Sequence, residues 1–168
     1  LLLDLLKDNS PARIVNVSSG AHDGADLDFD SLTGEEGPGG YSAYKQSKLA
    51  LIMFTYDLAE RLEGTEIDVN CLHPGSIRSN LGRDYSLLGV LWKYLPFLGS
   101  PERGAETPVY LASSLEVEGI TGKYFVDKEI ERSSSESYDK EVWKRLWKVS
   151  EDLTDLESVE MVPEVKGG

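Results

Sequence analysis

Tyr44 and Lys48 are the residues whose types and spacing most directly suggest chemistry. The pattern Tyr-x-x-x-Lys occurs twice, as Tyr41/Lys45 and Tyr44/Lys48. On a helix, a spacing of four residues places both side chains on neighbouring turns of one face. A phenol, with a reference pKa of about 10, is a poor base at neutral pH. An ammonium about 4 Å away stabilises the phenolate by roughly 4 kcal/mol at an effective dielectric near 20, which makes a usable general acid or base for an alcohol or carbonyl oxygen.

Helix geometry separates the two Tyr/Lys pairs. Successive residues turn by about 100°, so one stripe of the segment is built from small and apolar side chains: Ala43, Ser47, Ala50, Phe54 and Leu58. We expect this stripe to lie against a sheet, with Tyr44 and Lys48 at its edge. Tyr41 and Lys45 would face solvent. The spacing alone also fits a surface Tyr and Lys on an amphipathic helix, so further residues are needed.

Two more polar segments each follow a predicted strand. Ser19 comes directly after the β-branched run 13–17, which we interpret as a buried strand, and Pro74-Gly75 comes after a second run, 67–72. Ligands of open parallel sheets bind beyond the carboxyl ends of the strands. The Ser19 hydroxyl is therefore expected to bond a substrate oxygen while Tyr44 exchanges its proton. The rigid Pro-Gly turn and the Ser79 hydroxyl would face a planar amide. Ser18 or Ser19 alone would be an ordinary turn residue.

Strands and helices alternate along the chain, which predicts an α/β fold with a parallel sheet. Only three strands are visible. A three-stranded parallel sheet would be small and poorly covered for an enzyme that binds a dinucleotide, so we expect further strands upstream of Leu1. The predicted elements are a helix over 1–8, a strand over 13–17, a loop over 20–40, a helix over 41–63, a strand over 67–72, a helix from Ser100-Pro101 to about Ser114, a strand over 122–126 and a helix over 138–152.

Composition narrows the function classes. The 168 residues predict one domain over 1–153 and an acidic, disordered tail over 154–168. A net charge of -13 argues against a nucleic-acid partner. One cysteine excludes an internal disulfide, so we predict a reducing compartment, with the cytoplasm as the default. His22 and His73 are expected to be local hydrogen-bonding residues. With no third ligand nearby, we predict no metal site. The apolar segment 87–98 is too short to span a membrane.

Four motifs in this order resemble the short-chain dehydrogenase/reductase superfamily, and most closely its retinol-dehydrogenase-like members. They are Asn16-Val-Ser-Ser19, Tyr44-x-x-Ser-Lys48-Leu-Ala50, Asn70-x-x-His-Pro-Gly75 and Gly122-Lys-Tyr-Phe-Val-Asp127. The resemblance implies a Rossmann-like doubly wound sheet, of which this chain would be the C-terminal, catalytic portion. The activity implied is an NAD(P)-dependent oxidoreduction between an alcohol and a carbonyl.

The resemblance also implies roles for individual residues. Ser19 would polarise the substrate oxygen, Tyr44 would act as the acid/base, and Lys48 would assist Tyr44 and bind the nicotinamide ribose. The cofactor would be NAD or NADP, with a slight preference for NADP. Its expected binding residues are Tyr44, Lys48, Pro74, Gly75, Ile77 and Ser79.

Partners follow from the same resemblance. The helices over 1–8 and 41–63 resemble a pair that forms a homodimer interface, and a second apolar face of the longer helix fits that role: Leu49, Ile52, Met53 and Tyr56. The segment 87–98 lies where the family has a substrate lid, and its apolar character suggests a lipophilic carbonyl or alcohol, such as a retinoid or a long-chain aldehyde. Contact with a membrane surface and plain core packing are the alternatives for this segment.

The sequence also departs from the family. It contains no Gly-rich phosphate-binding turn, ribose-reading residue or upstream active-site Asn, so we expect this chain alone to bind cofactor poorly. Its first strand would expose an unpaired edge. The chief alternative function is a truncated, non-catalytic association module. An epimerase or dehydratase with bound NAD is disfavoured by the motifs around Asn70 and Gly122, and a serine hydrolase lacks the Gly-x-Ser-x-Gly elbow.

Overall fold

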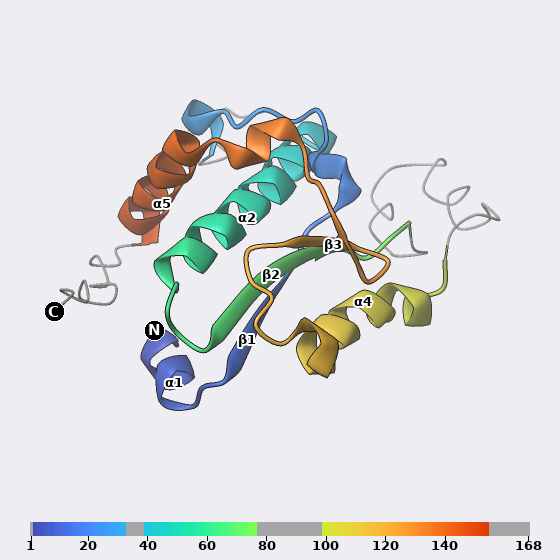
Figure 1. The fold of residues 1–168 in the computed structure, drawn as a ribbon. Helices are drawn as coiled ribbons and strands as arrows, with labels where there is room; N and C mark the ends of the chain where they lie inside the picture. Colours follow the sequence, from blue (N-terminus) through green and yellow to red (C-terminus); the bar gives the residue numbers. More distant parts are fainter. Residues whose placement is uncertain (1, 33–38, 77–98, 155–168) are drawn as a thin grey trace, which may run out of the picture.

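A computed structural model describes residues 2–32, 39–76 and 99–154 of the chain (Figure 1). The longer elements follow the predicted order closely, with ends that differ by a few residues. They are α1 (Leu3–Asp8), β1 (Ala12–Val17), α2 (Tyr41–Arg61), β2 (Ile67–His73), α4 (Pro101–Ser113), β3 (Tyr124–Val126), β4 (Glu129–Glu131) and α5 (Lys140–Thr154), with short 3-10 helices η1 (Gly20–His22), η2 (Phe29–Ser31), η4 (Leu115–Val117) and η5 (Ser135–Tyr138). The predicted tail beyond residue 154 lies outside the described residues.

The sheet has the order β1-β2-β3-β4. The first three strands are parallel, with Ala12 opposite Ile67 and Cys71 opposite Tyr124 in the register. This confirms the predicted α/β fold with a Rossmann-like parallel sheet. The antiparallel strand β4 was not predicted, because it has only three residues and all of them are exposed. It follows β3 through a two-residue turn in which Asp127 and Lys128 both have positive φ.

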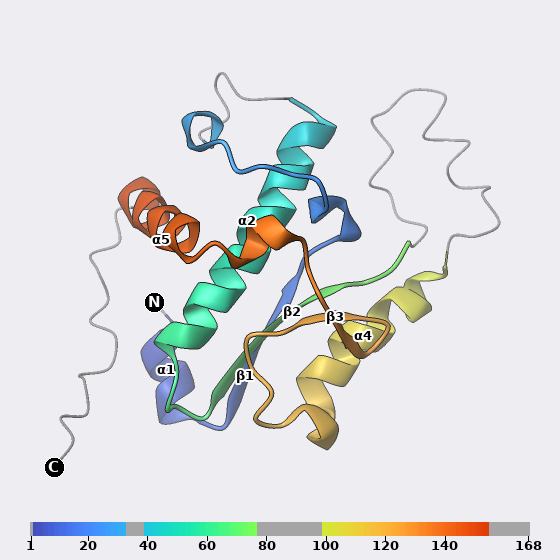
Figure 2. The ribbon, with the colours of Figure 1, turned by 45° about the horizontal axis from the view of Figure 1, so that its top comes forward.

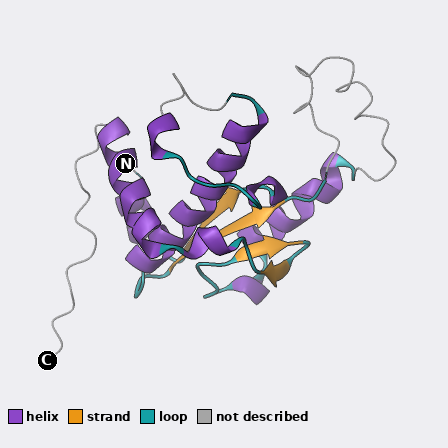
Figure 3. Cartoon of the chain, turned by 90° about the horizontal axis from the view of Figure 1, so that it is seen from above, coloured by secondary structure: helices purple, strands orange, loops and turns teal. Residues whose placement is uncertain are grey.

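Helices cover both faces of the sheet. Helices α2 and α5 lie on one face and α4 lies on the other (Figures 1 and 2), so the strands run between them when the molecule is viewed from above (Figure 3). Alternation along β2 serves both layers: Val69 and Cys71 join the core under α2, whereas Leu72 joins the core under α4. The doubly wound arrangement is therefore present within the described part of the chain.

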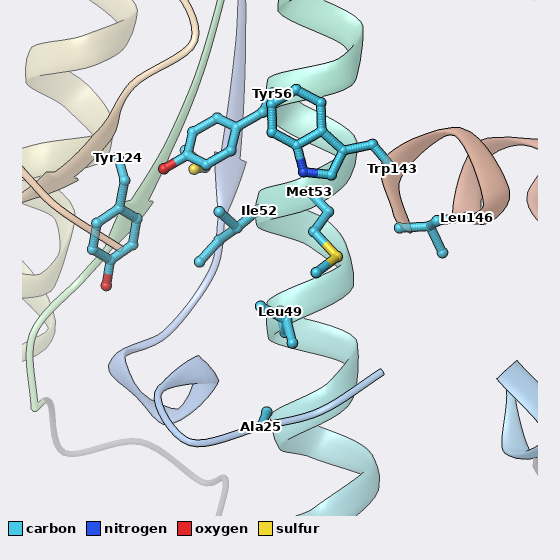
Figure 4. Packing of buried hydrophobic residues seen from close by; sticks show 9 residues of the cluster. Ala25, Leu49, Ile52, Met53, Tyr56, Tyr124, Trp143 and Leu146 are labelled. Atoms are coloured by element: carbon cyan, nitrogen blue, oxygen red, sulfur yellow. The ribbon is translucent and has the colours of Figure 1, made fainter. Parts of the chain in front are cut away.

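The face of α2 that packs inside the molecule is the one assigned above to a dimer interface, and that assignment is wrong. Leu49 and Ile52 are fully buried, with Met53 and Tyr56 nearly so. These side chains fill the space between the strands and α5, where they contact Trp143 and Leu146 (Figure 4). Burying large aliphatic side chains stabilises more than burying Ala and Ser. The stripe expected against the sheet is instead mostly exposed or half-buried: Ala43, Ser47, Ala50 and Phe54.

Strand β1 is less buried than predicted. Its residues are half-buried, and Val17 at its end is exposed. The cause is its position at the edge of the sheet, because among the described residues only β2 pairs with it. The predicted unpaired edge is thus present in this structure.

Local signals at the start of α4 are confirmed. The Ser100 side chain accepts a hydrogen bond from the Arg103 amide, and Pro101 occupies the first turn. None of the described helices combines the length and apolar character that a membrane crossing requires. The apolar segment 87–98 lies outside the described residues.

Asn70 joins β2 to the loop that leads into β3. Its side-chain amide donates to the Ile120 carbonyl, and its side-chain oxygen accepts from the Lys123 amide at 3.0 Å. Asn70 is buried. An Asn side chain offers a donor and an acceptor together, so it satisfies two backbone groups where the strands are not yet paired. This explains the place of Asn70 in its motif.

We expect Asn70→Ala to lower the free energy of unfolding by about 2 kcal/mol, because two backbone groups lose their partners. Urea denaturation of the 168-residue chain measures the change. The control is Asn9→Ala, since Asn9 donates to the Leu5 carbonyl at an exposed helix end and should change stability by no more than about 0.5 kcal/mol. Equal losses in both variants would contradict the bridging role of Asn70.

Candidate functional site

Two reciprocal hydrogen bonds join α2 to the carboxyl end of β1. The Lys48 ammonium donates to the Val17 carbonyl at 3.1 Å, and the Ser18 hydroxyl donates to the Lys48 carbonyl at 2.8 Å. About two turns further along α2, the Asn16 amide donates to the Thr55 hydroxyl at 2.9 Å. Ser18 is buried. The helix turn that carries Lys48 is therefore held directly against the end of the strand.

Tyr44 lies beside Lys48, as the four-residue spacing predicts. The Lys48 ammonium is 5.6 Å from the centre of the Tyr44 ring. Both side chains are half-buried. Tyr44, Lys48 and Ile52 follow one another at four-residue intervals on α2, so the first two lie at the edge of its buried face. From there a polar tip can reach the carboxyl ends of the parallel strands, which we call the mouth of the sheet.

The other Tyr/Lys pair behaves differently. Tyr41 is 63% exposed, as expected, and stacks on Tyr44 with 6.1 Å between ring centres. Lys45 is half-buried, not solvent-facing, because its ammonium donates to the Gly24 carbonyl at 2.9 Å. Lys45 thus holds the loop that follows Ser19. Its spacing from Tyr41 could not reveal this contact, which depends on where the loop runs.

Ser19 is placed by the short helix that follows it. Its hydroxyl oxygen accepts from the Ala21 amide at 3.2 Å and so caps η1. The hydroxyl proton is not used in that bond. Because Ser19 adjoins Ser18, which bonds Lys48, the structure brings Ser19, Tyr44 and Lys48 to the same end of β1.

The end of β2 meets the end of β1 through His73. A side chain on Gly20 would come within 3.2 Å of the His73 ring, so glycine permits the contact. Beyond it, Gly75 has a φ of +83°, which confirms the expected tight turn after Pro74. Ile77 and Ser79, the expected carboxamide ligands, lie outside the described residues.

The two histidines differ from each other. His22 is a local hydrogen-bonding residue, as predicted. For His73, no described residue pairs with the buried Nδ1 atom. Burial lowers the pKa of His73, and the nearby His22 ring lowers it further, whereas Asp127 opposes the change. His73 is therefore held in its neutral form at the mouth of the sheet.

Other chemistries find little support in the described residues. No group of three or more His, Cys, Asp or Glu side chains among them could hold a metal ion. Cys71 is buried in β2, and burial raises the pKa of its thiol to about 12. A thiol is a nucleophile only when it is ionised, so Cys71 is a core residue.

We expect stability to fall as the pH drops below about 6.5, the ordinary pKa of histidine, because the unfolded chain binds a proton at His73 more readily than the folded chain does. Above that pH, His73 is neutral in both the folded and the unfolded chain, so its full contribution to the free energy of unfolding is present. Urea denaturation at pH values between about 7.5 and 5.5 follows the loss. His73→Gln removes the titrating ring, so its stability should depend less steeply on pH. Identical slopes for the two proteins would count against a depressed His73 pKa.

Comparisons with known proteins match this chain to one family. The sequence model of the family described as "short chain dehydrogenase" matches residues 1–87. Retinol dehydrogenase 14 of Homo sapiens is 45% identical over 161 residues, which cover 93% of this chain and 48% of that protein. Retinol dehydrogenase 13 of Homo sapiens is 39% identical over 166 residues, covering 94% and 50%. The chain therefore spans about half the length of these relatives.

Solved structures give the same result. A crystal structure of an uncharacterized protein from Mycobacterium Paratuberculosis has a TM-score of 0.63 and 25% identity, covering 87% of this chain and 51% of that one. A structure described as a short chain dehydrogenase from Pseudomonas syringae has a TM-score of 0.53 and 26% identity, covering 73% and 43%. With the family model matching more than half of the residues, and with relatives named retinol dehydrogenase across nearly all of them, this chain belongs to the short chain dehydrogenase family as a retinol-dehydrogenase-like member.

Proposed function

We propose that this chain carries the catalytic groups of an NAD(P)-dependent oxidoreductase that interconverts an alcohol and a carbonyl. The observation that supports this most directly is the docking of the Lys48 turn on the end of β1, with Tyr44 beside the ammonium and Ser19 next to the docked strand. An ammonium beside a phenol, together with a hydroxyl at the mouth of a parallel sheet, is a set of groups suited to moving one proton to or from a substrate oxygen.

In carbonyl reduction, the Tyr44 hydroxyl gives its proton to the substrate oxygen, and the Lys48 ammonium stabilises the phenolate that remains. The Ser19 hydroxyl donates a hydrogen bond to the same oxygen, since the bond that it accepts from the Ala21 amide leaves its proton free. In alcohol oxidation these steps reverse. The nicotinamide cofactor, when bound, supplies or accepts the hydride.

The residues present fit such a cofactor. The Lys48 ammonium has three N–H donors and gives one to the Val17 carbonyl, so the others can bond ribose hydroxyls. At Gly75 no described atom lies within 4 Å of where a side chain would be, so the Pro74-Gly75 backbone can approach a planar amide closely. Tyr44, Ile77 and Ser79 complete the proposed set. We keep NADP as the slightly preferred cofactor.

The substrate we propose is a lipophilic, retinoid-like alcohol or carbonyl. This rests on the relatives named retinol dehydrogenase and on the apolar sequence of residues 87–98. We further propose a cytoplasmic protein that can contact a membrane surface, and a single catalytic unit over residues 1–153.

A homodimer through α1 and α2 remains our proposal, with the surface revised. The outward side of α2 that carries Ala43 and Ser47 is exposed, as are Leu2 and Leu5 at α1. Small residues allow two helices to approach closely, so this stripe replaces the buried face as the proposed dimer contact.

We expect Tyr44→Phe to lower kcat by roughly 10²- to 10⁴-fold in an extended chain that carries a nucleotide-binding half, because it removes the proton donor. Turnover of retinol or a long-chain aldehyde with NAD(P)(H) measures the loss. Tyr41→Phe is the matched control, since Tyr41 is exposed on the same helix turn and should keep full activity. If Tyr44→Phe retained most of the activity, the proposed acid/base would be wrong.

Cofactor binding separates the enzyme from the association module. We expect NAD(P)H fluorescence titration to show binding by the extended chain and little binding by the 168-residue chain, because the Gly-rich turn supplies the pyrophosphate contacts. Binding by neither form would favour the association module, and sedimentation analysis would then test self-association directly.

A further inference from the structure

His22 joins the Ser19 turn to a distant part of the chain. Its ring is 4% exposed and packs edge-on against Tyr124, with 5.1 Å between ring centres. Nδ1 lies 2.7 Å from the Ser19 carbonyl oxygen. Nε2 lies 3.1 Å from the Ser134 amide nitrogen, which is 112 residues away in sequence. Both ring nitrogens are therefore occupied, and each by a different segment.

The two partners assign the tautomer of His22. A backbone amide can only donate, so Nε2 must be the unprotonated acceptor for Ser134. A backbone carbonyl can only accept, so Nδ1 must carry the proton and donate it to Ser19. The neutral ring with its proton on Nδ1 satisfies both groups, and any other state of the ring breaks at least one of the two bonds.

The Ser134 end of this link is itself firmly held. The Ser137 hydroxyl donates to the Ser134 carbonyl at 2.6 Å, and it lies 2.6 Å from the Ser133 hydroxyl. The Ser133 hydroxyl in turn lies 2.7 Å from the Tyr56 hydroxyl of α2. The Trp143 indole of α5 donates to the Ser137 carbonyl at 2.7 Å. A buried network of this kind rigidifies the segment, so the Ser134 amide is a fixed anchor.

The Ser19 end depends on this anchor. The Ser19 carbonyl accepts from both the His22 amide, at 3.2 Å, and the His22 ring. The turn follows an edge strand, so few backbone contacts restrain it from the open side. Catalytic groups must be held to within about 0.5 Å of their working position, and the His22 ring adds the restraint on Ser19 that comes from a distant part of the chain.

We propose that His22 is a positioning residue, which sets the Ser19 hydroxyl by clasping the Ser19 carbonyl to the Ser134 amide through one ring tautomer. This rests on the proposed function, because it assumes that the Ser19 hydroxyl bonds the substrate oxygen. His22 does not itself touch the substrate. It transmits the rigidity of the residue 133–137 network to the reacting end of β1.

One position allows the clasp to be cut without touching the site. Ser134 has a φ of -58°, which proline adopts readily, so Ser134→Pro removes the amide donor without straining that angle. Ser134→Ala is its matched control, because it keeps the amide and removes only a hydroxyl that no described residue pairs with. His22→Phe removes both ring bonds and keeps an aromatic ring against Tyr124.

The tautomer is tested on the 168-residue chain by long-range ¹H–¹⁵N NMR of the imidazole rings. The sequence has two histidines, so His73→Gln assigns both sets of signals. We expect the His22 Nδ1 signal to be that of a protonated nitrogen and the Nε2 signal that of an unprotonated one. Ser134→Pro should change these signals, and Ser134→Ala should leave them in place. A protonated Nε2 in the unaltered chain would overturn the clasp.

The positioning role is tested by kinetics on the extended chain. Ser134→Pro and His22→Phe should lower kcat by roughly ten- to a hundredfold, as a displaced catalytic group does, with KM changed far less because substrate binding is retained. Ser134→Ala should match the unaltered enzyme. If Tyr44→Phe abolishes turnover and Ser134→Pro does not lower it, the positioning role is wrong and the proposed function stands. If the unaltered extended chain has no turnover, the proposed function fails, and the positioning role fails with it.

Discussion

The docking of Lys48 on the last carbonyl of β1 is the interaction on which the rest of the structure depends. The ammonium binds Val17, and Ser18 binds the Lys48 carbonyl in return, so helix and strand hold each other at one point. A helix can slide or rotate over a sheet unless polar contacts set its position, because apolar contacts are non-directional. These two bonds help to set it, together with the bond from Asn16 to Thr55, and both involve the lysine that stands beside Tyr44. Lys48 therefore contributes both to the packing of α2 on β1 and to the geometry of the proposed site.

The packing of α2 explains why that point is available. Leu49, Ile52 and Met53 bury themselves between the strands and α5, which turns Tyr44 and Lys48 to the edge of the buried face. Residues near this edge are half-covered, so a charged or phenolic tip can meet a ligand while its stem packs on apolar neighbours. The opposite side of α2 carries small residues and stays accessible. One helix thus supplies part of the core, the proposed reactive pair and the surface proposed for self-association.

The mouth of the sheet is assembled from segments that lie far apart in the chain. Gly20 lets the His73 ring approach the end of β1, Lys45 holds the loop at Gly24, and His22 reaches Ser134. Reactive groups on loops need a rigid scaffold to place them. Here the scaffold is partly the strands and partly the hydroxyl network around Tyr56, Ser133 and Ser137. Residues 133–154 are then a support for the site as well as a cover for the sheet.

Local signals in the sequence were enough to predict the longer helices and strands and the proximity of Tyr44 and Lys48. β-Branched runs predicted β1 and β2, Ser100-Pro101 predicted the start of α4, and the four-residue spacing placed Tyr44 beside Lys48, because each of these depends on neighbours within a few residues. The roles of Ser19, Tyr44 and Lys48 came from the resemblance and stay a proposal. Tertiary structure alone decided which face of α2 is buried, since that helix has two apolar faces and periodicity cannot tell which one the strands and α5 will cover. It also decided the short strand β4, the contact of Lys45 with Gly24 and the bond between His22 and Ser134, because contacts between residues distant in sequence exist only once the chain has folded.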